Sequence, residues 1–76
     1  MADRLPRVTA EKALRALQRA GWYVSRQSGS HAVLRHPTKR GRVVVPRHAR
    51  AILKPGMLSG IIKDAELTVE EFRELL

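Results

Sequence analysis

A Gly-Ser-His triplet at positions 29–31 is the part of this sequence whose residue types are best suited to chemistry. Gly29 allows a tight backbone turn and Ser30 can form local hydrogen bonds, so His31 would stand beside a turn at the start of a strand. An imidazole in that place can act as a general acid or base. The spacing also allows an ordinary strand histidine, because one histidine alone is weak evidence for catalysis.

The charge around this triplet is entirely positive. No aspartate or glutamate occurs between Lys12 and Lys63, and the formal net charge of the 76-residue chain is +8. Such a chain attracts nucleic acids, although the charge also fits an acidic membrane or an acidic protein. The lack of nearby carboxylates argues against two-metal nuclease chemistry and against catalysis by paired acids. We therefore expect neither a metal ion nor another cofactor.

The remaining candidates for catalysis, Ser30, His36 and His48, are less well placed than His31. His36 lies five residues from His31, which in a strand means roughly 16 Å and opposite faces, so the two are not an acid–base pair. His36 precedes Pro37 and is predicted to be a surface residue flanking a turn. His48 follows the last strand and could approach the site, but a structural or binding role is favoured. Ser30 is an unsuitable nucleophile, because His31 would point to the opposite face.

Four cations surround the loop of a predicted hairpin. They are Arg35, Lys39, Arg40 and Arg42. Because no acidic residue nearby in the sequence balances their charge, we expect these four side chains to form a rim that binds phosphate groups. A solvated basic loop is the alternative. Trp22 and Phe72 occur at core positions, which leaves Tyr23 as the plausible exposed aromatic residue.

The elements that would position these residues follow from local signals. Thr9 is predicted to N-cap an amphipathic helix that ends at Gly21. Three short antiparallel strands are then expected, at residues 22–27, 31–36 and 42–45. Val33 and Leu34 are both apolar, so the sequence leaves open which of them faces the helices.

Two more helices are predicted after an irregular segment at residues 47–54. A helical pattern follows Pro55-Gly56, and a Thr-x-x-Glu capping box at residues 68–71 begins a short last helix. The order α-β-β-β-α-α predicts a single α+β domain over residues 1–76, with its helices packed on one face of the sheet.

The composition also bears on the cellular compartment. The chain has no cysteine, which removes disulfides and thiolate zinc sites. Residues 1–7 lack the apolar run of a signal peptide, and no stretch approaches the roughly 18 apolar residues of a membrane span. We expect a cytoplasmic protein that does not associate with membranes.

Several segments together resemble the HicA (YcfA-like) toxins of bacterial toxin–antitoxin pairs. They are Gly21-Trp22 (where that family usually has Gly-Phe), Gly29-Ser30-His31, Arg35-His36-Pro37, residues 43–48, Lys54-Pro55-Gly56, the helix at 61–65, and Glu70-Glu71-Phe72. Each segment is a weak signal, but their order and spacing extend over most of the chain, from about Thr9 to Leu76.

The resemblance implies a double-stranded-RNA-binding-domain-like fold, with helices on one face of a three-stranded antiparallel sheet. It implies an mRNA endoribonuclease, an mRNA interferase, that is inhibited by a HicB-type antitoxin and has His31 as its catalytic residue. We expect His31 to act as a general base without a metal, while Ser30 and the four hairpin cations bind RNA. A non-catalytic RNA-binding module is the main alternative, and a small ribosome- or nucleoid-associated protein is another.

Overall fold

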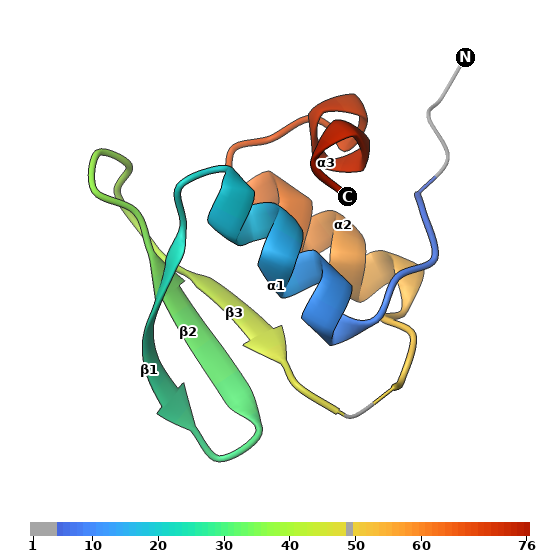
Figure 1. The fold of residues 1–76 in the computed structure, drawn as a ribbon, viewed down its shortest axis with the longest axis horizontal. Coiled ribbons are helices and arrows are strands. Elements are labelled where there is room, and N and C mark those ends of the chain that lie inside the picture. Colours follow the sequence, from blue (N-terminus) through green and yellow to red (C-terminus); the bar gives the residue numbers. More distant parts are fainter. Residues whose placement is uncertain (1–4, 49) are drawn as a thin grey trace.

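The computed structural model describes residues 5–48 and 50–76. Its elements are α1 (Ala10–Arg19), β1 (Tyr23–Ser28), β2 (His31–Arg35), β3 (Val43–Pro46), α2 (Pro55–Asp64) and α3 (Val69–Leu75). The strands form one antiparallel sheet in the order β1-β2-β3, and the helices lie on one side of it (Figure 1). The predicted α+β class and the order of elements are confirmed.

Local signals explain where α1 begins and ends. The Thr9 side-chain oxygen accepts a hydrogen bond from the backbone N–H of Lys12 at 3.3 Å. Glu11 in the first turn complements the positive end of the helix dipole. Gly21 ends the helix with φ at +100°, in the left-handed region that favours glycine. Both predicted boundaries of this helix are therefore confirmed.

The register of β2 against β3 decides which side chains face the helices. Ala32 pairs with Val45, and Leu34 pairs with Val43. These four side chains are fully buried in the core beneath the helices. The choice that the sequence left open is thereby settled, because Leu34 faces the core.

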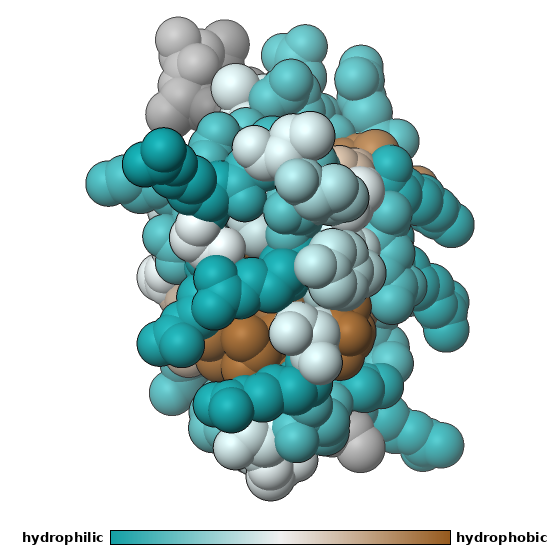
Figure 2. Space-filling view, turned by 90° about the vertical axis from the view of Figure 1, so that its left-hand side faces the viewer, coloured by the Kyte–Doolittle hydropathy of each residue, from teal (hydrophilic) through white to brown (hydrophobic). Residues whose placement is uncertain are grey.

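The opposite face of the sheet carries His31, Val33 and Arg35, since side chains alternate along a strand. Val33 pairs with Val44 on this outer face and stays 9% exposed. Figure 2, seen from the side on which the sheet lies, shows mostly hydrophilic side chains around a small hydrophobic patch. The outer face is therefore open to solvent and available to a ligand.

The hydrophobic core fills the space between the sheet and the helices. Trp22 and Phe72 are the largest fully buried side chains, and Tyr23 is 51% exposed, as predicted. The capping box of α3 is present, because the Thr68 and Glu71 side chains each bind the other residue's backbone N–H, at 3.0 and 2.8 Å. Among the described residues, no helix is long and apolar enough to cross a membrane.

His36 flanks a turn as predicted, but it is half-buried and not on the surface. Its ring packs edge-on against Trp22, with the ring centroids 5.2 Å apart. Its Nδ1 accepts hydrogen bonds from the backbone N–H groups of Thr38 and Lys39, at 3.1 and 3.3 Å. Since Nδ1 is an acceptor, Nε2 carries the proton and donates a hydrogen bond to the Ala20 carbonyl at 3.2 Å. His36 thus ties the hairpin loop to the end of α1.

Candidate active site

His31 is exposed at the first position of β2. It pairs with Ser28 of β1 and with Pro46 of β3, so it stands in the middle of one end of the sheet. Within the described residues, its ring makes no hydrogen bond to protein. The imidazole is therefore accessible to a ligand and is not committed to a structural contact.

A cavity of about 370 Å³ opens beside His31. It is lined by His31, Pro46, His48, Ala51, Ile52, Leu53, Lys54 and Met57. The polar groups are two imidazoles and one ammonium group, and the remaining wall is apolar. Ile52 and Met57 are about half exposed there, which offers a surface on which a ribose or a base can pack.

The turn that carries His31 is held by Arg47 and Gln27. The Arg47 backbone N–H donates to the Ser30 carbonyl, and the Gln27 side-chain amide donates to the Gly29 carbonyl at 3.1 Å. The Arg47 guanidinium binds both carboxylate oxygens of Glu11, at 2.9 and 3.1 Å, and the Gln27 side-chain oxygen at 3.0 Å. These bonds connect α1, β1 and the segment after β3.

The Glu11–Arg47 pair changes the properties of both groups. The hydrogen bond from Arg47 is the main cause that lowers the pKa of Glu11 below its ordinary value, and the charge of Arg15 contributes. The same hydrogen bond raises the pKa of Arg47. Because its charge is matched by a carboxylate, Arg47 is a positioning residue for the turn and a poor phosphate ligand.

Lys54 and the first turn of α2 supply positive charge to the cavity. Lys54 is the N-cap residue of α2, which has Pro55 in its first turn, no acidic residue there and no side-chain cap. The amino end of a helix attracts anions through its free N–H groups and its dipole. A Cβ atom added at Gly56 would meet open space, so the backbone is accessible there. This end of the cavity fits a phosphate group.

The four predicted hairpin cations lie at the other end of β2 from His31. Four residue steps separate Arg35 from His31, or roughly 13 Å along the strand. The Arg35 guanidinium donates to the Gly41 carbonyl, and the Lys39 ammonium donates to the Ala65 carbonyl, both at 3.3 Å. The remaining two cations, Arg40 and Arg42, are exposed. Ser30 adjoins His31 in the sequence, whereas the structure places the hairpin cations roughly 13 Å or more from His31.

Lys54 was not predicted to be a cavity residue, and His48 was expected only as a residue that could approach the site; both line the cavity beside His31. The signal for His48 lay in the strand pairing, because an antiparallel partner for His31 must come near the end of the third strand. The signal for Lys54 lay in the sequence Lys54-Pro55-Gly56, which is typical of a helix start. Neither signal gives a distance without the sheet register.

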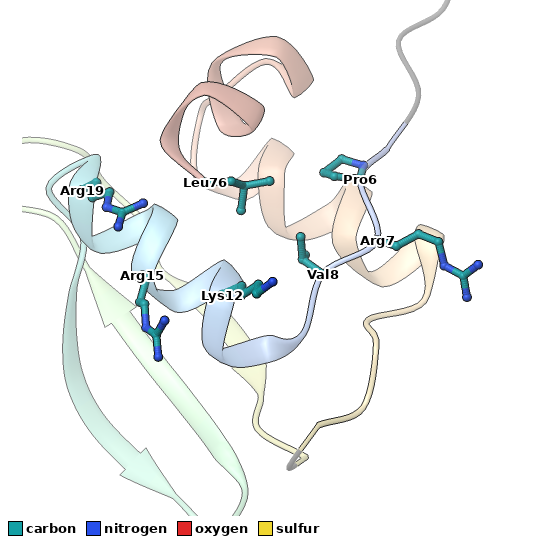
Figure 3. A pocket seen from close by; sticks show the side chains of 7 residues that line it. All are labelled: Pro6, Arg7, Val8, Lys12, Arg15, Arg19 and Leu76. Carbon is teal, nitrogen blue, oxygen red and sulfur yellow. The ribbon is translucent and has the colours of Figure 1, made fainter.

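A second cationic surface follows the exposed side of α1 (Figure 3). This groove of about 360 Å³ is lined by Pro6, Arg7, Val8, Lys12, Arg15, Arg19 and Leu76. Part of its charge is used internally, because Arg19 donates to the Leu75 carbonyl at 2.6 Å. The groove contains no imidazole, so it can bind anions but has no group suited to proton transfer at neutral pH.

Among the described residues, no group of three histidine, aspartate or glutamate side chains could hold a metal ion.

The fold and the site define a small α+β domain of the double-stranded-RNA-binding-like type, with an accessible histidine in a cationic cavity. A comparison with protein families gives a match over residues 10–67 to the family described as "HicA toxin of bacterial toxin-antitoxin". That range is more than half of the chain, so the chain belongs to the HicA toxin family. Membership makes it the toxin of a toxin–antitoxin pair and implies an antitoxin partner. No curated protein matches the chain.

Proposed function

We propose that this toxin is an endoribonuclease that cleaves mRNA in the cytoplasm without a metal ion, with His31 as its general base. The observation that carries the proposal is that His31 is exposed and shares one cavity with Lys54 and the amino end of α2. A side chain that can act as a base and an ammonium group that can bind phosphate thus line the same cavity. RNA supplies the nucleophile, because its 2′-hydroxyl lies beside the phosphate to be cleaved.

Each group has a defined task in this reaction. The neutral His31 ring removes the proton of the 2′-hydroxyl, and the oxygen attacks the adjacent phosphorus in line with the bond to the 5′-oxygen. That bond breaks, which leaves a 2′,3′-cyclic phosphate and a 5′-hydroxyl. Lys54 and the N–H groups of the first turn of α2 stabilise the charge that develops on the phosphate oxygens. A general base contributes about 10²–10⁴-fold to the rate.

The predicted RNA-binding residues divide into two groups in this proposal. Ser30 lies next to His31 and contacts the nucleotide that is cleaved. The exposed Arg40 and Arg42 bind phosphates further along the same strand, because the hairpin is roughly 13 Å from His31. Their contribution is to affinity for RNA and not to the chemical step.

The antitoxin is proposed to be a HicB-type protein. An inhibitor with an acidic surface would complement the positive charge around the cavity and accelerate association. Since the cavity wall includes the exposed Ile52 and Met57, a protein that covers it would also bury apolar surface.

A cleavage assay on purified protein tests the proposed activity. Wild type and His31→Ala are incubated with labelled RNA in EDTA, and binding is measured in parallel by mobility shift. We expect the variant to lose at least about 10²-fold in cleavage rate and to keep its affinity. The matched control is His36→Gln, whose ring lies at the other end of β2, with folding checked by a thermal melt. DNA of the same sequence must stay intact, because it lacks the 2′-hydroxyl.

Two results would overturn the proposal. Cleavage by His31→Ala at the wild-type rate would exclude His31 as the base. A mobility shift by the wild type without any RNA fragments would favour the alternative, a non-catalytic RNA-binding module.

A further inference from the structure

Two imidazoles lie in one cavity, although they are 17 positions apart in the sequence. His31 comes from β2, and His48 comes from the segment that follows β3. Both are exposed, and among the described residues neither ring makes a hydrogen bond to protein. His36 differs, because both of its ring nitrogens are bound to the protein backbone. His31 and His48 are therefore the two histidines that can exchange protons with a ligand in this cavity.

Backbone hydrogen bonds on either side of His48 define the course of its segment. The Arg47 N–H extends the pairing of β3 with β2 beyond the last strand residue, by donating to the Ser30 carbonyl. The Arg47 side chain is fixed by Glu11, so the chain leaves the sheet in a defined direction. Ala51 then donates its N–H to the His48 carbonyl at 3.1 Å, which turns the segment back towards α2.

The proposed cleavage leaves one proton unassigned. When the 2′-oxygen attacks, the 5′-oxygen departs as an alkoxide unless it receives a proton, and an alkoxide is about as poor a leaving group as hydroxide. A ribonuclease without a metal therefore needs an acid on the side of the phosphate opposite the base. Lys54 is the charged group that lines the cavity, but an ammonium group holds its proton more firmly than an imidazolium does. An imidazolium fits the task better at neutral pH.

We propose that His48 is the general acid of the cleavage reaction and protonates the departing 5′-oxygen. This inference rests on the proposed ribonuclease function. His31 accepts the proton of the 2′-hydroxyl, the new bond forms between the 2′-oxygen and phosphorus, and the bond from phosphorus to the 5′-oxygen breaks. The 5′-oxygen takes its proton from protonated His48. After the reaction His31 is protonated and His48 is neutral, and exchange with water restores both.

A sulfur-substituted substrate separates this role from a structural one. The cleavage site of the wild type is first mapped on a short RNA, and the 5′-oxygen at that site is then replaced by sulfur. A thiol has a pKa of about 8.5, so its thiolate leaves without protonation. We expect His48→Ala to slow cleavage of normal RNA by about 10²-fold or more and to cleave the sulfur substrate within a few-fold of wild type. His31→Ala should be slow on both substrates.

Each result of this experiment either supports or overturns the role of His48 as the general acid. If His48→Ala is equally slow on both substrates, His48 positions the loop or the RNA and is not the acid. If His48→Ala cleaves normal RNA at the wild-type rate, it has no role in the reaction, and the ribonuclease proposal with His31 still stands. If the wild type cleaves neither substrate, the ribonuclease proposal fails and this inference fails with it. His48→Gln, with a thermal melt, checks that the fold is kept.

Discussion

Replacing Gly21 by alanine tests the arrangement that holds the hairpin loop to α1. Gly21 has a φ of +100°, which an alanine adopts only with strain. An added Cβ atom would also lie 2.7 Å from the Nε2 atom of His36 and 3.2 Å from its Cδ2 atom. The ring must therefore move, and it loses its 3.2 Å hydrogen bond to the Ala20 carbonyl.

The expected cost can be worked out from these two effects. Left-handed backbone costs an alanine about 1–2 kcal/mol, and a lost hydrogen bond costs about 1 kcal/mol. Gly21→Ala should therefore lower the free energy of unfolding by about 2–3 kcal/mol, out of about 4–11 kcal/mol expected for a domain of this size. The midpoint of thermal unfolding should fall by about 8–24 °C.

Gly41→Ala is the matched control, because Gly41 also has a positive φ, at +80°, but a Cβ atom there meets nothing within 4 Å. Gly41→Ala should lower the free energy of unfolding by about 1–2 kcal/mol, from backbone strain alone. Urea unfolding followed by the fluorescence of the buried Trp22 measures both variants. In a double-mutant cycle, Gly21→Ala should cost about 1 kcal/mol less in the His36→Ala background than in wild type. An equal cost in both backgrounds would refute the contact between Gly21 and His36.

Two further predictions concern the hairpin and the Glu11–Arg47 pair. The double variant Arg40→Ala, Arg42→Ala should raise the KM for RNA with kcat unchanged, and should reduce the salt dependence of binding by about 1.4 in the log–log slope; a loss in kcat alone would contradict this. The pKa of Glu11 is lower in the folded state than in the unfolded chain. The Glu11–Arg47 pair therefore stabilises the fold fully at pH values above the ordinary glutamate pKa of about 4.3. This stabilisation is lost as the pH falls through the lower pKa of the folded state. The stability difference between wild type and Glu11→Gln, measured by urea unfolding, should therefore be present at pH 7 and vanish near pH 2; a difference independent of pH would disprove the assignment.

Most of the fold could be predicted from the sequence, because its boundaries are set by contacts within a few residues. The Thr9 cap, the capping box of Thr68 and Glu71, and the left-handed Gly21 all depend on local hydrogen bonds or local backbone strain. Such signals can be recognised in the amino-acid sequence itself. The strand ends differ from the prediction by one residue in most cases, where the local preferences change gradually.

Predictions that required knowledge of long-range contacts were less complete. His36 was expected on the surface, but it packs against Trp22 because the hairpin folds back over the end of α1. Leu34 was not distinguished from Val33, since adjacent strand residues face opposite sides and both are apolar. The hairpin cations were grouped with His31, although the length of β2 separates them.

The amino-acid sequence by itself determined the helices and strands, the positive charge around His31 and the absence of nearby acids, because these depend on composition and on spacing over a few residues. Only the tertiary structure decided which groups share a cavity with His31. His48 and Lys54 reach it because β3 pairs alongside β2 and because the following segment, fixed by Arg47, returns to the start of α2. That arrangement depends on strand register and on contacts such as the one between Glu11 and Arg47, 36 positions apart, which local preferences do not encode.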